Sequence, residues 1–179
     1  MARDLQNLLD HYALDKAVVV GHSMGALTLW QYLRDFGESR LARLVIIDQS
    51  PRLLTDDDWK NGIYGDFDRH KNAAFIGELE RDFAEALLRL VAFGHNERAR
   101  AAYLENAAGI ESARQRLRMQ APRPLIDCWA SLTAADYRDV LATITIPALL
   151  VYGSASNFYS TGTAHYVRDS IPNALLHIY

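Results

Sequence analysis

Apolar residues show two different arrangements in the first 50 residues of the chain, helical spacing and short continuous runs. Leu5, Leu8 and Leu9 follow the spacing of an amphipathic helix, with charged and amide side chains on the opposite side. Two short apolar runs follow further on. The first of them, at 17–20, shows no alternation, which is typical of a parallel strand buried on both faces. We expect a helix over 2–13, a strand over 17–20, a helix over 24–36 stopped by Gly37, and a strand over 44–47.

The middle of the chain has a different character. Residues 51–130 contain no run typical of a strand, and their apolar residues recur at helical spacing. The strand pattern returns after Pro147, with a helical segment between two apolar runs. We expect helices over 74–93, 96–107, 109–119 and 124–132, then a strand over 148–152, a helix over 161–170 and a last strand over 174–179.

These elements predict an α/β protein with a mostly parallel sheet and an inserted helical cap. A strand, a helix and a second strand within about 30 residues form a βαβ unit, whose strands are parallel and whose crossover is right-handed. The core is expected to comprise residues 1–50 and 131–179. Residues 51–130 are expected to form the helical cap.

The composition narrows the class of protein. The 179 residues carry a formal net charge of −3, and 50% of them are hydrophobic, as in ordinary soluble globular proteins. Because no basic face is implied, we expect no nucleic-acid partner. The single cysteine, Cys128, cannot form an internal disulfide or a metal cluster on its own, and we expect no metal site. With no signal peptide and no apolar run of membrane-spanning length, we expect a cytoplasmic protein without a membrane partner.

A motif for nucleophilic catalysis lies between the first strand and the helix that follows it. The run Gly21-His22-Ser23-Met24-Gly25 has the pattern G-x-S-x-G, in which a sharp turn raises the serine above the end of the sheet. The two glycines keep side chains out of that turn. The helix N-terminus stabilises developing negative charge, and the N–H of Met24 would supply one oxyanion-hole donor. The alternative is a tight strand-to-helix turn with an incidental serine.

Residues 18–26 resemble the nucleophile elbow of α/β-hydrolase esterases. The resemblance continues through 41–48, which is similar to the next strand of that family, and through 135–139 and 146–153, which are similar to the segment after its cap. It implies that Ser23 attacks the carbonyl of a small-molecule carboxylic ester or related acyl substrate, and that no cofactor is needed. A serine here argues against dehalogenase or epoxide hydrolase chemistry, which uses a carboxylate at this position.

The expected cap contains several aromatic residues. They would suit a mainly apolar acyl pocket, and packing within the cap explains them equally well. These residues are Trp59, Tyr64, Phe67 and Trp129.

The resemblance also directs the search for the acid of a catalytic triad. Most members of the family carry it after the strand that ends here at Gly153, where this chain has the run 154–157, Ser-Ala-Ser-Asn, without a carboxylate. Some members place the acid after the strand that follows the elbow, and Asp48 occupies that position. Asp48 would then fix the tautomer and orientation of a histidine base. The alternative is that Asp48 only caps its loop or pairs with Arg52.

The histidine of the triad has no candidate at the family position. Members carry it after the last strand, and here that strand reaches the end of the sequence. Position in the fold decides a triad role, and structural or surface positions are expected for all six histidines. They are His11, His22, His70, His95, His165 and His177.

The first strands of the family would precede the helix at 2–13. Without them the elbow strand becomes an edge, and an exposed apolar edge offers a surface for self-association. We therefore expect a fragment, a truncated product or part of an assembly, lacking the N-terminal strands and the C-terminal histidine segment. The alternative to a serine hydrolase is a catalytically incomplete hydrolase-like domain with a binding or assembly role.

Overall fold

The computed structural model describes residues 1–179, which form two compact units. Unit 1 comprises residues 1–52, 136–154 and 159–179, and unit 2 comprises residues 53–135 and 155–158. All four strands belong to unit 1, and unit 2 is helical. The role of the helical segment as a cap stays a prediction.

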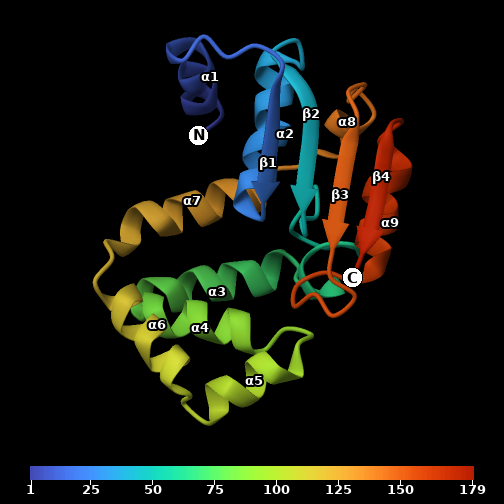
Figure 1. The fold of residues 1–179 in the computed structure, drawn as a ribbon. Coiled ribbons are helices and arrows are strands. Elements are labelled where there is room, and N and C mark those ends of the chain that lie inside the picture. Colours follow the sequence, from blue (N-terminus) through green and yellow to red (C-terminus); the bar gives the residue numbers. More distant parts are fainter. The chain divides into compact units, whose positions relative to one another are not determined.

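Four parallel strands form the sheet of unit 1, in the order β1-β2-β3-β4 (Figure 1). Their carboxyl ends meet at one edge of the sheet, which confirms the predicted parallel α/β architecture. The strand β2 begins at Leu41 rather than at residue 44, because Leu41 is buried and pairs with Ala17. The strands are β1 (Ala17–His22), β2 (Leu41–Ile47), β3 (Ala148–Tyr152) and β4 (Ala174–Ile178).

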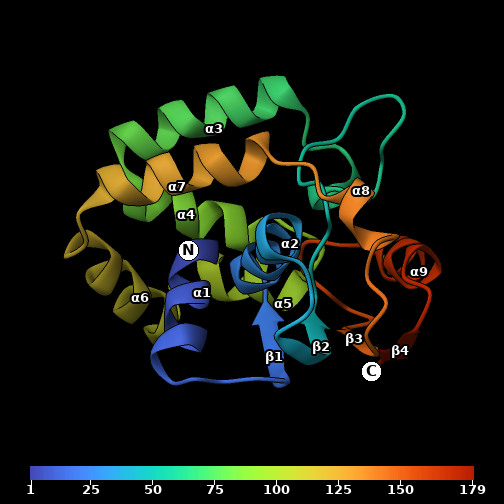
Figure 2. The same ribbon diagram turned by 90° about the horizontal axis from the view of Figure 1, so that it is seen from above.

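Helices cover one face of this sheet. Figure 2 shows α2, α8 and α9 on the same side of the strands, and α1 packs against α2. The predicted helix after the elbow is confirmed: α2 begins at Met24, and Gly37 follows its last residue with a φ of 71°. The buried side of α2 includes Leu29 and Trp30. The helices of unit 1 are α1 (Ala2–His11), α2 (Met24–Phe36), α8 (Arg138–Leu141) and α9 (Thr161–Ser170).

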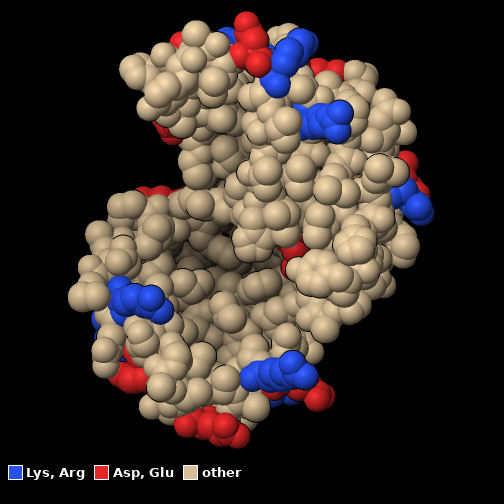
Figure 3. Space-filling view, in the orientation of Figure 1, with Lys and Arg blue, Asp and Glu red and all other residues tan.

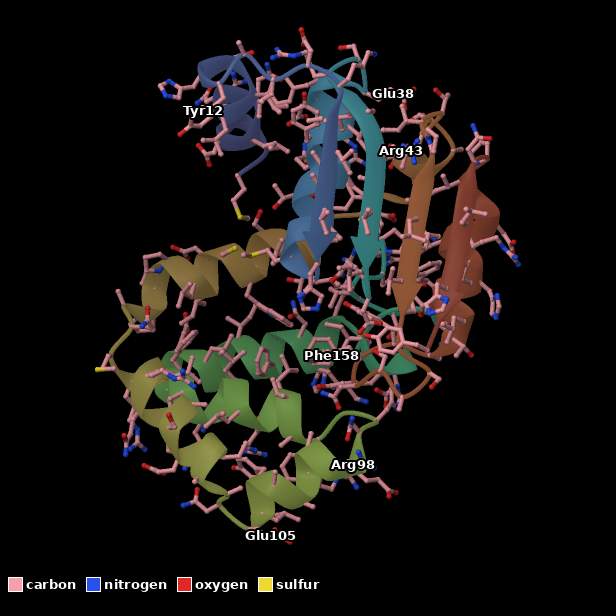
Figure 4. All side chains as sticks on the ribbon, in the orientation of Figure 1. Tyr12, Glu38, Arg43, Arg98, Glu105 and Phe158 are labelled. Carbon is pink, nitrogen blue, oxygen red and sulfur yellow. The ribbon has the colours of Figure 1, made fainter.

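The other face of the sheet carries exposed apolar side chains. The prediction that β1 is buried on both faces is wrong: Val18 and Val20 are 60% and 62% exposed, whereas Val19 is buried. Alternate residues of a strand point to opposite faces, and α2 covers only the face of Val19. Over the strands, Figure 3 shows few acidic or basic side chains, and Figure 4 labels one of them, Arg43, near the start of β2. The strand β1 forms an edge of the sheet.

Unit 2 consists of five helices and a short 3-10 turn. The prediction of a single helix over 74–93 is wrong. The helix is interrupted at Asp82, where φ is −149°. Asp82 ends one helix, and its side chain caps the next by accepting a hydrogen bond from the N–H of Glu85 at 3.1 Å. None of the helices in either unit has the length and apolar character needed to cross a membrane. The elements of unit 2 are η1 (Ile63–Gly65), α3 (Arg69–Arg81), α4 (Phe83–Ala92), α5 (Glu97–Leu104), α6 (Ala108–Arg118) and α7 (Pro122–Ala134).

Ring contacts and an ion-pair cluster hold unit 2 together. Phe67 and Phe75 both contact the indole of Trp129 edge-on, with centroids 6.2 and 5.1 Å apart. These contacts favour packing as the reason for the aromatic residues of this segment. Arg114 joins two carboxylates, at 2.9 Å from Glu85 and 2.6 Å from Glu111.

The close approach of β1 to α2 depends on a glycine. A Cβ placed on Gly21 would lie 2.7 Å from the backbone nitrogen of Ala26 and 2.7 Å from Cδ1 of Leu29. Ordinary carbon contacts need about 3.5–4.0 Å, so a side chain would push the helix away from the strand. Gly25 differs, because a Cβ there would meet open space. Crowding in the structure therefore explains the first elbow glycine and not the second.

Replacing Gly21 by alanine is expected to lower the free energy of unfolding by about 1–3 kcal/mol, because the new methyl group overlaps the backbone of Ala26. Gly25→Ala is the matched control inside α2. It is expected to leave that free energy unchanged or to raise it by up to about 1 kcal/mol, since alanine is the better helix former. Urea unfolding followed by circular dichroism measures both variants, and equal losses would contradict the close approach as the cause.

Candidate active site

Ser23 occupies the junction between β1 and α2, and its backbone is strained. It follows the last residue of β1 directly and precedes the first residue of α2, with φ 52° and ψ −122°. A positive φ is uncommon for a residue with a side chain and persists only where neighbouring structure holds it. Three backbone bonds hold it here: the N–H of Ser23 donates to the carbonyl of Ile47 at 3.2 Å, and its carbonyl accepts from Ala26 at 2.9 Å and from Leu27 at 3.4 Å. The side chain is exposed, which is the geometry of a nucleophile elbow.

The positive end of α2 lies beside this serine. Met24 is the first residue of the helix, so its N–H belongs to the turn whose amide groups point out of the N-terminal end. No acidic side chain lies in the first turn of α2, and the helix dipole therefore favours an anion at this position. The predicted oxyanion role of Met24 agrees with this placement and stays a prediction. His22 ends β1 and, like Val18 and Val20, has an exposed side chain.

Asp48 follows the last residue of β2 and turns the chain away from the sheet. Its φ is 46°, and its N–H donates to the carbonyl of Val151 on β3 at 2.9 Å. Because His22 pairs with Ile47 in the parallel register, the residues that follow them, Ser23 and Asp48, leave neighbouring strands at the same level. The structure thus brings the backbones of the two predicted triad residues to one edge of the sheet. The role of Asp48 as the acid stays a prediction.

A buried polar network lies directly after Asp48, and no sequence motif predicts it. Gln49 is 2% exposed, and its side-chain amide donates to the hydroxyl of Tyr159 at 2.9 Å and to the carbonyl of Ser50 at 3.0 Å. The hydroxyl of Tyr152 donates to the backbone carbonyl of Gln49 at 2.6 Å. Burial raises the pKa of Tyr152 well above its usual value, so its hydroxyl keeps the proton that it donates.

The loop after β3 makes structural contacts at the position where the resemblance described above would place the acid of the triad. The run 154–157 has no carboxylate, and Asn157 instead binds the turn between α4 and α5 within unit 2. Its side-chain amide donates to the carbonyl of Val91 at 2.7 Å, and its side-chain oxygen accepts from the N–H of Asn96 at 3.1 Å. Its backbone carbonyl accepts from the N–H of His95 at 2.9 Å. Asn157 is therefore a structural residue.

All six histidine side chains are exposed. His177 lies inside β4, as predicted, and its ring stacks on that of Tyr179 with centroids 6.2 Å apart. His95 belongs to unit 2 and contacts the ring of Tyr64 edge-on at 5.9 Å. The structure provides no group of three or more His, Cys, Asp and Glu side chains that could hold a metal ion.

Comparisons with known proteins place this geometry in a family. The model of the alpha/beta hydrolase fold matches residues 1–179. The pimeloyl-[acyl-carrier protein] methyl ester esterase of Pectobacterium atrosepticum is 28% identical over 181 residues, which cover 96% of this chain and 64% of the esterase. A putative non-heme chloroperoxidase of Synechocystis is 28% identical over 186 residues, covering 99% of this chain and 63% of that protein.

A solved structure shows the same fold. The esterase EaEST from Exiguobacterium antarcticum superposes with a TM-score of 0.80 at 20% identity, over 100% of this chain and 63% of the esterase. The chain thus spans less than two thirds of the length of the proteins that it matches. With the elbow geometry and the match along its whole length, the chain belongs to the alpha/beta hydrolase fold family.

Proposed function

We propose that this chain carries the nucleophile of a serine hydrolase that acts on a carboxylic ester or a related acyl substrate. The observation that carries the proposal is the strained, exposed Ser23 at the N-terminal end of α2. A strand-to-helix turn with these features is what an activated serine of this fold requires. The relative from Pectobacterium atrosepticum is named as a methyl ester esterase, which supports an ester as the substrate class.

In the proposed reaction the hydroxyl oxygen of Ser23 forms a bond to the acyl carbon, and a histidine base accepts the serine proton. The N–H of Met24 donates a hydrogen bond to the oxyanion of the tetrahedral intermediate. The carbon–oxygen bond to the alcohol then breaks, and the base returns its proton to the departing oxygen. Water attacks the acyl-serine in the same way and releases the acid. Asp48 would orient the base and stabilise its positive charge.

Ser23→Ala is expected to lower kcat for p-nitrophenyl butyrate by a factor of about 10⁴ or more, because no other group can form the acyl intermediate. Ser39→Ala is the matched control, since Ser39 is also exposed and lies in the turn that precedes β2. Steady-state hydrolysis by the natural protein and its variants measures both. A Ser23 variant that keeps more than a tenth of the activity would rule out Ser23 as the nucleophile.

Asp48→Asn is expected to lower kcat by about 10³- to 10⁴-fold, because the amide would hold the base in the wrong tautomer. Arg52→Gln distinguishes this role from a structural ion pair. Arg52 lies 3.8 Å from Asp136, and its side chain is 16% exposed. Its loss should lower stability while kcat stays within about threefold, because Arg52 has no part in the proposed triad. If the two variants lost activity equally, Asp48 would serve as an ion-pair partner and not as the acid.

A further inference from the structure

We propose that Gln49, Tyr152 and Tyr159 position Asp48 for the proposed reaction. We call these three residues the Gln49 network. The proposal rests on the proposed function, because it assigns the network a part in the work of the triad acid. None of the three residues is placed in contact with the substrate, so each acts through Asp48.

The backbone of Asp48 needs support from outside its own loop. Asp48 has a φ of 46°, and such a backbone conformation costs a residue with a side chain about 1–3 kcal/mol. It persists only where tertiary contacts hold it in place. One such contact is the bond from its N–H to Val151 on β3. That bond fixes the amino side of Asp48 only. The direction of its side chain depends on the residue that follows it as well.

The Gln49 network fixes that following residue at its side chain and at its carbonyl. The carbonyl of Gln49 accepts from Tyr152, and the amide of its side chain donates to Tyr159. The three side chains are 2%, 2% and 7% exposed in the order Gln49, Tyr152, Tyr159. An unmade hydrogen bond at such a depth costs about 1–3 kcal/mol, so the network specifies one arrangement of the loop. With the peptide before Asp48 bound to β3 and the residue after it held at its side chain and its carbonyl, the loop carries Asp48 in one arrangement.

The network also joins segments that are far apart in the sequence. It links the loop after β2, the last residue of β3 and the residue that precedes the N-cap of α9. Residues 155–158 belong to unit 2, and Tyr159 is the first residue of the chain segment that belongs to unit 1 again. A purely structural network would support this return of the chain without any effect on catalysis, and the two roles predict different kinetics.

Tyr159→Phe removes the acceptor of Gln49 and keeps the ring. We expect kcat for p-nitrophenyl butyrate to fall by roughly tenfold with KM unchanged, because a displaced acid misaligns the base without touching substrate binding. The matched control is Tyr137→Phe, since Tyr137 is 5% exposed and its hydroxyl donates to the side-chain oxygen of Gln31 at 3.0 Å. The control should lose similar stability and keep its kcat.

Combination with Asp48→Asn separates positioning from stability. If Tyr159 acts through Asp48, Tyr159→Phe should cause no further loss of kcat in the Asp48→Asn background. The same factor in both backgrounds, or an equal loss of kcat in Tyr137→Phe, would overturn the proposal. Should Tyr159→Phe fail to fold, Tyr152→Phe removes the other bond and carries the same expectation. If Asp48→Asn alone keeps full activity, the acid assignment fails first and the positioning role falls with it.

Discussion

The parallel pairing of β1 with β2 is the constraint on which the candidate site depends. Its register sets His22 opposite Ile47, and the carbonyl of Ile47 continues the ladder one residue further by accepting from the N–H of Ser23. The same register makes Asp48 the first residue beyond β2. A shift by one residue would move the serine away from the level of the carboxylate and would turn every side chain of β1 to the opposite face. One backbone ladder therefore decides the placement of both residues.

Two strained residues stand at the end of that ladder, and each has its own support. Ser23 is held by backbone bonds to β2 and to the first turn of α2, and Gly21 lets the helix come close enough to make that turn. Asp48 is held by β3 on one side and by Gln49 on the other. Strained backbone conformations are frequent at active sites, where the direction of a side chain matters more than local stability. The support comes from three strands, which makes the site a property of unit 1 and not of one motif.

Local sequence patterns predicted the elbow. The features that they did not predict depend on contacts between residues far apart in the sequence. The glycines and apolar run around Ser23 fixed the strand, the turn and the helix, because these elements form from neighbouring residues. The break at Asp82 also had a local signal, since an aspartate three residues before a glutamate is typical of a helix start. The hydrogen bond between Gln49 and Tyr159 joins residues 110 positions apart, and no local sequence pattern predicts it. The exposure of Val18 and Val20 was missed because an apolar run does not tell which of its faces is covered.

The measurement that tests this account most directly is covalent labelling of the natural protein with a fluorophosphonate probe, followed by mapping of the adduct. Cleavage by trypsin after Lys16 and Arg34 releases residues 17–34, a peptide with Ser23 as its single serine. The account predicts that the mass of the adduct falls on this peptide, because only an activated serine reacts with the probe. An adduct on another peptide, or no adduct in protein that hydrolyses esters, would contradict Ser23 as the nucleophile.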